Sequence, residues 1–240
     1  MPEREVDDRP DLPYGTSDRY LGAQGLAYHR QKFADEASGT FFASSKFNAL
    51  VCSEDTVLDF GAGVGDALAG LSCRRRIAVE INPASRTRCA ERGLETYADL
   101  SEVPVGLIDL IITNHCLEHV PYPIEALRQL RLRLKPEGRL AVCVPINDWR
   151  MQRRYDPRDQ NHHLHTWTPQ LLGNTLREAG FLVDPKAISI MNRTRPGRFS
   201  RSLYRLLPPR LFMAVCRLWA VMVRRRELFA VVSVRPDSSS

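Results

Sequence analysis

The chain has 240 residues, of which 43% are hydrophobic and 26% are charged, and its formal net charge at pH 7 is +6. This length suits one α/β domain with additions, and the hydrophobic content is that of an ordinary globular protein. The apolar runs are shorter than the ~20 residues of a membrane-spanning helix, and the polar N-terminus predicts no secretory signal. The six cysteines are scattered and include no C-x-x-C pair. They therefore predict no disulfide or zinc framework and fit a reducing cytoplasm.

Residues 1–54 are predicted to form an N-terminal arm and cap helices ahead of the core. Residues 1–16 carry charges and three prolines and are expected to be a loose arm. Apolar residues at helical spacing predict one helix from Ser17 to Glu36 and a second from Phe41 to Val51. The second helix is expected to follow Gly39.

The chain is organised around a stretch that leads from an apolar run into a glycine-rich turn. The apolar run predicts a buried strand from Thr56 to Phe60. The turn that leaves this strand carries three alternating glycines, Gly61, Gly63 and Gly65. Glycine is needed where a ligand comes within contact distance of the main chain, because a Cβ atom would block it. The free N–H groups of the turn and of the next helix suit a polar or negatively charged ligand group.

An acidic residue in the next predicted strand, Ile77–Ile81, adds to this picture. Glu80 follows Gly63 by seventeen residues. A carboxylate at a strand end can accept two hydrogen bonds from a ribose diol. The glycine turn and this acid together predict a nucleoside-containing cofactor at the carboxyl edge of a parallel sheet.

Strand and helix signals alternate along the predicted core, residues 55–190. Two helices begin at pairs that favour helix starts, Asn82 with Pro83 and Thr168 with Pro169. This alternation predicts a doubly wound parallel sheet of the α/β class. The predicted elements are helix 66–71, strand 77–81, helix 83–92, strand 94–97, strand 107–113, helix 123–134, a helix stop at 135–138, strand 139–144, a binding loop at 145–167, helix 169–180, strand 181–190 and, within 227–240, strand 227–234 and a disordered tail.

A basic helical insertion, residues 191–226, precedes the final strand. It holds ten arginines and no acidic residue, so the rest of the chain is mildly acidic. Residues 211–223 within it are apolar almost all round and too few to span a bilayer. Three roles stay open: contact of 199–226 with an anionic membrane surface, packing against a second copy as a homodimer, and closure over the substrate. Nucleic acid is disfavoured as a partner, because no RNA-binding module is visible.

The glycine turn differs from that of a dinucleotide-binding protein. The last glycine of G-x-G-x-x-G is replaced here by Asp66, which disfavours a nicotinamide cofactor. The pattern that begins at Asp59 and continues through the three glycines instead resembles motif I of class I S-adenosylmethionine-dependent methyltransferases.

The resemblance continues in the family's order over roughly residues 55 to 190, in the form of its type 11/23-like subgroup. It implies a Rossmann-like seven-stranded sheet with the last strand antiparallel, an N-terminal helical cap, and S-adenosyl-L-methionine as the cofactor. The stretches that carry it are Val79–Asn82 (ribose acid), Tyr97–Leu100 (adenine-side acid), Ile108–Val120 (the "LEHV" form of the motif after the fourth strand), His163–Pro169 and Ala179–Phe181.

The resemblance also implies roles for individual residues. Glu80 is expected to hold the ribose, and Asp99 with Leu100 to lie beside the adenine. Asp59 is expected near the charged end of the cofactor, or to order the glycine turn. Residues just past the fourth strand lie where the methyl group and the acceptor should meet. The predicted cofactor-binding set is Asp59, Gly61, Ala62, Gly63, Gly65, Glu80, Ile81, Asp99, Leu100, Asn114 and His115.

Three N-terminal tyrosines have two alternative roles. In the resembled class, the cap helices lie over the cofactor pocket, so Tyr14, Tyr20 or Tyr28 could touch the cofactor or the substrate. The alternative is packing of these rings on the edge of the sheet.

Methyl transfer to a hydroxyl is helped by a general base, because the oxygen must lose a proton. Histidine suits this role near neutral pH. His119, His115 and His163 are the predicted candidates, and His162 and His165 are further ones. The alternative for His165 is packing, together with Trp167, at the rim of the pocket.

No metal site is predicted. His115, Glu118 and His119 match the H-x-x-E-H motif of inverted zinc proteases, but the match starts at a strand end and stops at Pro121 instead of lying in a helix. The stretch also resembles ubiquinone-pathway O-methyltransferases, in which an acid-x-x-Glu-His cluster can hold a divalent ion. His115 replaces the first acid here, and magnesium prefers oxygen ligands. Glu118 and His119 are therefore expected to form a structural hydrogen-bonded pair.

The sequence thus predicts a single-domain methyltransferase of the cytoplasm, with peripheral membrane contact left open. O-methylation of a small-molecule, glycan or lipid-linked acceptor is the predicted reaction. The alternative is a non-catalytic protein that retains the fold and binds a nucleoside or a partner. A dehydrogenase is disfavoured by the missing third glycine.

Overall fold

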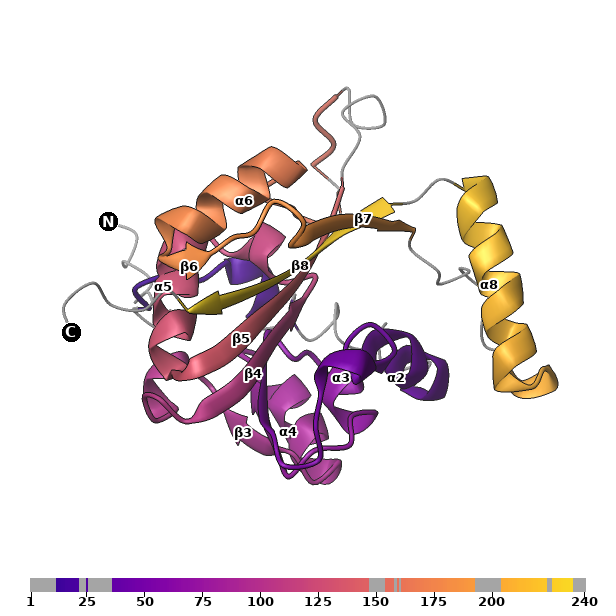
Figure 1. The fold of residues 1–240 in the computed structure, drawn as a ribbon, viewed down its shortest axis with the longest axis horizontal. Helices are drawn as coiled ribbons and strands as arrows, with labels where there is room; N and C mark the ends of the chain where they lie inside the picture. The colour runs from indigo at the N-terminus through magenta and orange to yellow at the C-terminus, as the bar shows by residue number, and fades with distance from the viewer. Residues whose placement is uncertain are drawn as a thin grey trace, which may run out of the picture.

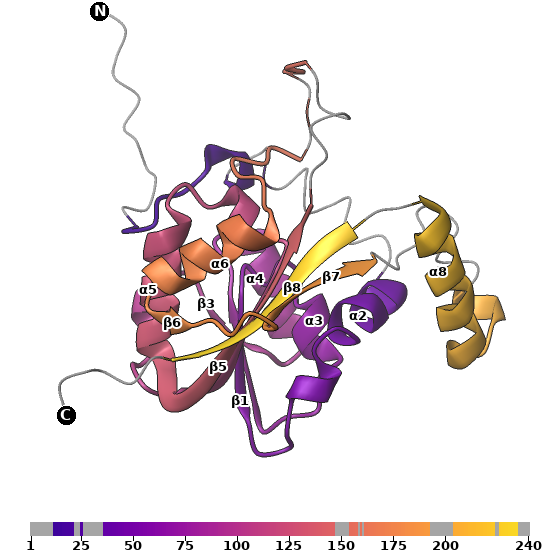
Figure 2. The same ribbon diagram turned by 45° about the horizontal axis from the view of Figure 1, so that its top comes forward.

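The protein is described by a computed structural model that covers residues 12–21, 25, 36–146, 154–157, 159, 161–192, 204–223 and 226–234. These residues form an eight-stranded mixed sheet between layers of helices, as Figures 1 and 2 show. The strand order is β3-β2-β1-β4-β5-β8-β6, and β7 also pairs with β8. The predicted α/β class with an antiparallel last strand is confirmed.

Most predicted elements are present, with boundaries shifted by one or two residues. The strands are β1 (Thr56–Phe60), β2 (Arg75–Val79), β3 (Glu95–Tyr97), β4 (Ile108–Asn114), β5 (Leu134–Pro145), β6 (Phe181–Leu182), β7 (Ile188–Asn192) and β8 (Arg226–Val234). The described helices are α2 (Glu36–Ser44), α3 (Asp66–Ala69), α4 (Pro83–Glu91), α5 (Pro123–Arg133), α6 (Pro169–Glu178) and α8 (Pro209–Val223), with 3-10 turns η1 (Asp18–Tyr20), η3 (Asn48–Leu50), η4 (Leu100–Glu102) and η5 (Leu117–His119).

The centre of the sheet is parallel, and its strand order reverses beside β1. β2 and β3 lie on one side of β1, and β4 and β5 lie on the other. Connections that diverge in this way leave a crevice at the carboxyl ends of the two central strands, where α/β proteins bind ligands.

The core has two layers, one on each face of the sheet. Val57 belongs to the layer under α3 and α4, and Leu58 belongs to the layer under α5 and α6. Both side chains are fully buried. The first strand therefore reads as a continuous apolar run, as expected of a strand covered on both faces.

Both predicted helix starts are confirmed by their capping bonds. The Asn82 side chain accepts a hydrogen bond from the Ser85 N–H at 3.1 Å. The Thr168 hydroxyl oxygen accepts one from the Leu171 N–H at 3.1 Å. Each bond satisfies an N–H group that the first turn of a helix leaves without an intrahelical partner.

The prediction for the start of β5 is wrong. α5 ends at Arg133, but β5 begins at once with Leu134, which pairs with Ile108. Pairing resumes between Leu110 and Arg139, so residues 135–138 are an irregular part of the strand. The buried Leu134 side chain fixes this early start.

The predicted strand 181–190 is two short strands that share one edge of β8. β6 pairs with the end of β8 and β7 with its beginning, both antiparallel. Asp184 separates them, because its carboxylate accepts from the Lys186 N–H at 2.7 Å and its carbonyl accepts from the Ala187 N–H at 2.9 Å. Such an Asx turn breaks an extended chain.

The N-terminal helices also differ from the prediction. α2 begins at Glu36, so Gly39 lies inside the helix. A Cβ atom on Gly39 would come within 2.7 Å of Asp66 Oδ2, so this glycine allows α2 to lie against α3. Of the predicted helix Ser17–Glu36, the turn η1 is described, and residues 22–24 and 26–35, Tyr28 among them, lie outside the described residues, as do residues 1–11 and 235–240.

The predicted helix of the basic insertion is α8, and residues 193–203 and 224–225 lie outside the described part. In Figures 1 and 2, α8 stands beside α2 and projects from the rest of the molecule. Among the helices described, none has the length and the apolar content to cross a bilayer.

Candidate functional site

A cleft opens at the carboxyl ends of β1, β2 and β4. The segment before and within η1 forms one wall, and the glycine turn and the chain after β4 form the others. Its lining residues are Leu12, Tyr14, Gly15, Thr16, Ser17, Tyr20, Phe60, Gly61, Gly63, Val79, Glu80, Ile81, Ala98, His115, Cys116, His119, Val120 and Pro121. The cleft therefore lies where the strand order predicts a ligand.

Two glycines of the turn are required for different reasons. Gly61 has φ +74°, and a Cβ atom there would lie 2.3 Å from Cys116 Sγ, so Gly61 is needed for packing. Gly63 has φ +58°, and a Cβ atom there would meet nothing within 4 Å. Since Gly63 lines the cleft, its bare main chain is open to a ligand.

Glu80 is fixed in place at the floor of the cleft. Its Oε2 accepts from the Gly63 N–H at 2.8 Å, and its Oε1 accepts from the Asn82 N–H at 2.8 Å. The residue is 6% exposed. Each carboxylate oxygen can accept a second hydrogen bond, so the held carboxylate can still bind a diol.

Tyr14 lies between the cleft and the predicted adenine-side acid. Its hydroxyl donates to Asp99 Oδ2, and its ring packs edge-on against Phe60 with centroids 5.6 Å apart. Burial and the bond to Asp99 raise the pKa of Tyr14, so it stays a donor. Burial by itself would raise the pKa of Asp99, but hydrogen bonds from Ser101 and Tyr14 outweigh burial and lower it. Asp99 is therefore a charged acceptor near neutral pH.

Asp59 is a buried acid beneath the glycine turn. It is 3% exposed, and its Oδ1 has no hydrogen-bond partner among the described residues. Burial, followed by the carboxylates of Glu80 and Asp66, raises the pKa of Asp59 well above its ordinary value. A cationic ligand group nearby would relieve this accumulation of negative charge.

The structure divides the predicted cofactor residues into two groups. Gly61, Gly63, Glu80, Ile81 and His115 line the cleft. The others are not among the described residues that line the cleft, and Leu100 belongs to the hydrophobic core. The members of this second group are Asp59, Ala62, Gly65, Asp99, Leu100 and Asn114.

A network of charged side chains, mostly or fully buried, lies beside the cleft at the turn after β4. The Lys46 ammonium group lies 2.9 Å from Glu227 Oε2 and 3.1 Å from Asn114 Oδ1. His115 Nε2 lies 2.9 Å from the same Glu227 oxygen. His115 Nδ1 lies 3.3 Å from a carboxylate oxygen of Glu118, close enough for an ion pair. His115 has φ +55°, a conformation rare for a non-glycine residue, at the turn where β4 ends.

The network makes His115 a cation and its partners anions. Burial opposes a charged His115, but its contacts with Cys143, Glu118 and Glu227 outweigh burial and raise its pKa to about 10. Burial likewise opposes a charged Glu227, but His115 and Lys46 lower its pKa to about 2. A histidine that is already protonated at neutral pH cannot accept a proton, so this geometry disfavours the predicted role of His115 as a base.

His119 is the candidate base that the geometry favours. Its Nδ1 lies 2.7 Å from the Tyr20 hydroxyl and 3.3 Å from the His162 carbonyl oxygen. A carbonyl only accepts, so we assign the Nδ1–H tautomer, which puts the lone pair on Nε2. Nε2 lies 3.8 Å from the Glu118 carboxylate, which is fully buried and would stabilise the proton-bearing ring.

The other predicted histidines are less well placed. His163 packs its ring edge-on against His119, with centroids 4.9 Å apart, and is not among the lining residues of the cleft. His165 Nε2 bonds the Val120 carbonyl at 2.9 Å, and His162 is exposed. For His165, whose ring centroid lies 6.0 Å from that of Trp167, these contacts fit the packing at the pocket rim that was the alternative for this residue.

Two groups of described side chains could hold an ion. The ligand atoms of His115, Cys143 and Glu227 are close together, but the Lys46 ammonium group already provides a positive charge there, 3.2 Å from Cys143 Sγ. The second group is Glu118, His119 and His163. The absence of a metal therefore stays a prediction.

Sequence reasoning missed Lys46 and Glu227. The two residues are 181 positions apart, so no local motif links them. One signal was present: Glu227 is the first acid after the ten arginines of residues 191–226, and it directly precedes the apolar run of β8. An acid at such a position, 2% exposed in the structure, requires a partner.

Comparison with known proteins gives a family match and several structural likenesses. The family described as "Methyltransferase domain" matches residues 26–185, which is 160 of the 240 residues. No curated protein matches the chain.

Among solved structures, one similar chain comes from a Haloferax volcanii complex between the Trm112 methyltransferase activator and a methyltransferase. It is 16% identical to this chain with a TM-score of 0.63, and the match covers 90% of this chain and 100% of that one. The 1,6-didemethyltoxoflavin-N1-methyltransferase of Burkholderia thailandensis is 20% identical with a TM-score of 0.58, covering 97% and 98%. The cyclase SpnF is 18% identical with a TM-score of 0.56, covering 92% and 85%. At these identities the likeness is one of fold.

Proposed function

This chain belongs to the methyltransferase domain family, and we propose that it methylates a hydroxyl oxygen of a small-molecule, glycan or lipid-linked acceptor. The family identifies a class I fold and S-adenosylmethionine as the cofactor. The oxygen acceptor is our own inference from the side chains that meet at the acceptor end of the cleft.

The residues of the cleft fit this cofactor. Glu80 presents a fixed carboxylate for the ribose diol, and Gly63 leaves its main chain open beside it. The unpartnered oxygen of Asp59 lies in an acidic, buried setting that suits the cationic end of the cofactor. When bound, S-adenosylmethionine supplies a methyl group that is already activated by the positive charge on sulfur.

The protein must then position the acceptor and remove its proton. With S-adenosylmethionine bound, the walls of the cleft would hold the acceptor oxygen in line with the activated methyl group. The proton of the hydroxyl moves to His119 Nε2, and the buried Glu118 carboxylate stabilises the resulting charge. The neighbouring His115 stays protonated and holds the end of β4 in place through Glu227.

The observation that carries this proposal is the position of His119. Of the predicted candidates for the base, only His119 and His115 line the cleft in the described structure, and His115 is a cation. His119 is held at Nδ1 by the Tyr20 hydroxyl and the His162 carbonyl. Such fixed orientation is what a catalytic base requires.

The proposal is tested with S-adenosylmethionine that carries carbon-13 in the methyl group. The purified protein is incubated with this cofactor and a cell extract, and the labelled product is examined by NMR, in which methyl groups on oxygen, nitrogen and carbon have distinct shifts. We expect an oxygen-bound label that depends on His119. A nitrogen- or carbon-bound label would contradict O-methylation.

A second function has one observation in its favour. A protein described as a cyclase has this fold, so the fold by itself does not determine the reaction. The alternative is a protein that binds the nucleoside or a partner without methyl transfer, and a chain from a complex with an activator protein is also similar in structure. Calorimetry separates the two: tight cofactor binding without any labelled product would favour the alternative.

A further inference from the structure

Helix α8 is attached to the body of the protein by one narrow apolar stripe. Phe212, Cys216 and Ala220 recur every four residues and are buried. Phe212 packs against Phe42 of α2 with ring centroids 5.3 Å apart, and against Tyr204 at 5.2 Å. This small aromatic cluster orients the helix and decides which side faces outward.

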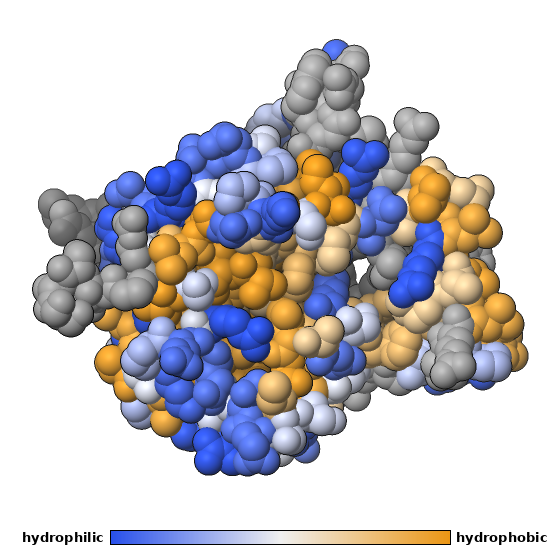
Figure 3. Space-filling model, in the orientation of Figure 1, coloured by the Kyte–Doolittle hydropathy of each residue, from blue (hydrophilic) through white to orange (hydrophobic). Residues whose placement is uncertain are grey.

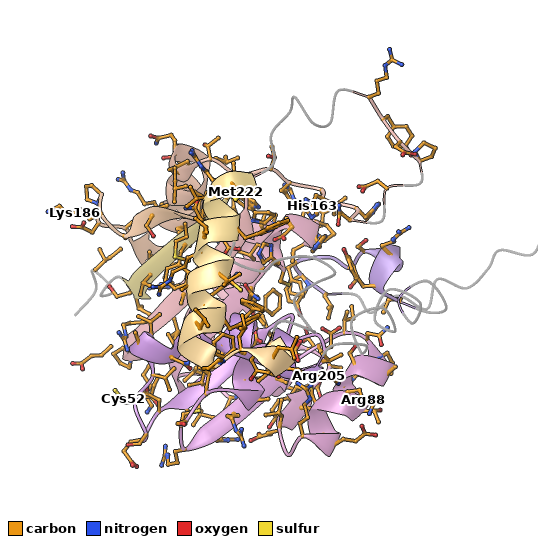
Figure 4. All side chains as sticks on the ribbon, turned by 90° about the vertical axis from the view of Figure 1, so that its right-hand side faces the viewer. Cys52, Arg88, His163, Lys186, Arg205 and Met222 are labelled. Carbon is orange, nitrogen blue, oxygen red and sulfur yellow. The ribbon has the colours of Figure 1, made fainter. Side chains whose placement is uncertain are left out.

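The outward side of α8 is also apolar. Leu211, Leu218 and Met222 are 51%, 67% and 71% exposed, and their spacing of seven and four residues places them in one row along the helix. Val221 and Trp219 flank this row and are 62% and 43% exposed. We call these five residues the outer apolar face. Figure 3 shows apolar surface over α8 at the right of the molecule, and Figure 4 views α8 from outside, with Met222 labelled near its upper end.

The insertion that contains the outer apolar face carries positive charge and no negative charge in its sequence. The insertion 191–226 contains ten arginines and no acid. Arg205 before the helix, Arg217 within it and Arg226 after it are exposed. An exposed apolar patch of this kind marks a contact surface, and its charge requires a partner that is negatively charged.

A second copy of this chain does not meet that requirement. A two-fold contact places the same surface on both partners, so two arginine-rich insertions without acids would lie against one another. Nucleic acid would be complementary in charge, but it would leave the row of Leu211, Leu218 and Met222 without an apolar partner. An anionic lipid bilayer provides both the negative charge and the apolar contact. Its headgroups are negative, and the boundary between headgroups and acyl chains accommodates apolar side chains.

We propose that α8 docks on the surface of an anionic phospholipid bilayer, with the outer apolar face in the headgroup–acyl boundary and the arginines at the headgroups. A helix of this length is about 22 Å long and lies in the plane of the membrane. Trp219 suits the same boundary, because its ring is apolar and its N–H is polar. This inference does not depend on the proposed methyl transfer.

The test uses the full-length protein and sedimentation with vesicles. Vesicles of phosphatidylcholine alone are compared with vesicles that also contain phosphatidylglycerol, at low and at high salt. We expect binding to the anionic vesicles at low salt and weaker binding at high salt, because salt screens the attraction of the arginines. No binding to anionic vesicles at low salt would overturn the proposal.

Variants then assign the binding to α8. Leu218→Ser with Met222→Ser removes apolar side chains and keeps the charge, and we expect at least roughly tenfold weaker binding. Val105→Ser is the matched control, because Val105 is 69% exposed and lies between η4 and β4. Equal vesicle binding by wild type and the double variant would overturn the proposal. It would also be overturned if wild type did not bind vesicles but formed a homodimer in light scattering, and the double variant were monomeric. Unchanged cofactor binding shows that the variant is folded and separates this test from that of the proposed function.

Discussion

His115 Nε2 lies 2.9 Å from Glu227 Oε2, although the two residues are 112 positions apart. The contact joins the turn after β4, where the acceptor is expected, to the start of the antiparallel strand β8. Lys46 contacts the same carboxylate oxygen, so the three residues form a triad around the buried Glu227 side chain. The final strand therefore contributes to the site as well as to the sheet.

The triad predicts a pH-dependent stability. His115 has its pKa raised from 6.5 to about 10, so its contribution is fully present below about pH 6.5 and is lost as the pH rises through 10. Glu227 has its pKa lowered from 4.5 to about 2, so its contribution is present above about pH 4.5 and is lost as the pH falls through 2. Urea unfolding between pH 6 and 10 should show a falling free energy of unfolding for wild type and a flatter curve for His115→Gln.

Removing one member of the triad should be costly. Glu227→Gln leaves Lys46 and His115, both mostly but not fully buried, without the carboxylate that they share, although His115 keeps Glu118. We therefore expect a loss of about 3–5 kcal/mol of unfolding free energy at pH 7. Glu91→Gln is the matched control, because it removes an exposed ion pair with Arg88 and should cost less than about 1 kcal/mol. Equal losses in the two variants would contradict the assigned burial of the triad.

Substitution of the histidines should separate structure from catalysis. His119→Asn should reduce turnover by about 10²–10⁴-fold and leave cofactor binding intact, because it removes the base and not the cofactor's contacts. His163→Asn should reduce turnover far less. Turnover is measured as formation of S-adenosylhomocysteine with the identified acceptor. A His119 variant that keeps full turnover would remove this residue from the mechanism.

Two glycines should respond differently to the same substitution. Gly61→Ala should lower the melting temperature, since its Cβ would lie 2.3 Å from Cys116 Sγ. Gly63→Ala places its Cβ in open space at the cleft. The φ strain should lower the free energy of unfolding by roughly 1 kcal/mol. The binding free energy of the cofactor should fall by more than this amount. Thermal unfolding and calorimetry on both variants check this, and a Gly63 variant with unchanged affinity would show that the cofactor does not approach this residue.

Tyr14 should affect the cofactor through Asp99. Tyr14→Phe removes the hydroxyl that donates to Asp99 and helps to keep that acid charged, so we expect about fivefold weaker cofactor binding. Tyr122→Phe is the control, because Tyr122 is 64% exposed and outside the cleft. Equal dissociation constants for wild type and Tyr14→Phe would exclude this role.

The sequence was sufficient for features that depend on local pattern. The run Thr56–Phe60, the glycine turn and the capped helix starts at Asn82 and Thr168 follow from periodicity and capping chemistry, and all are present. Glu80 was also predictable as a cleft residue, because it directly follows β2 beside the glycine turn.

The differences arise where distant segments meet. Gly39 reads as a helix boundary, but its contact with Asp66 explains why it lies inside α2. The partnership of Lys46 and Glu227 requires β8 to lie beside β5, a pairing that no local motif encodes. The charge state of His115 follows from this same pairing, so its unsuitability as a base was visible only in the structure.

The most direct measurement for the whole account is the calorimetric dissociation constant of S-adenosylmethionine for wild type and Glu80→Gln, with Glu91→Gln as control. Glu80 is anchored by Gly63 and Asn82 and faces the cleft, whereas Glu91 lies exposed on α4. We predict that wild type and Glu91→Gln bind equally and that Glu80→Gln binds at least roughly tenfold more weakly. No binding by wild type, or equal binding by Glu80→Gln, would contradict the account.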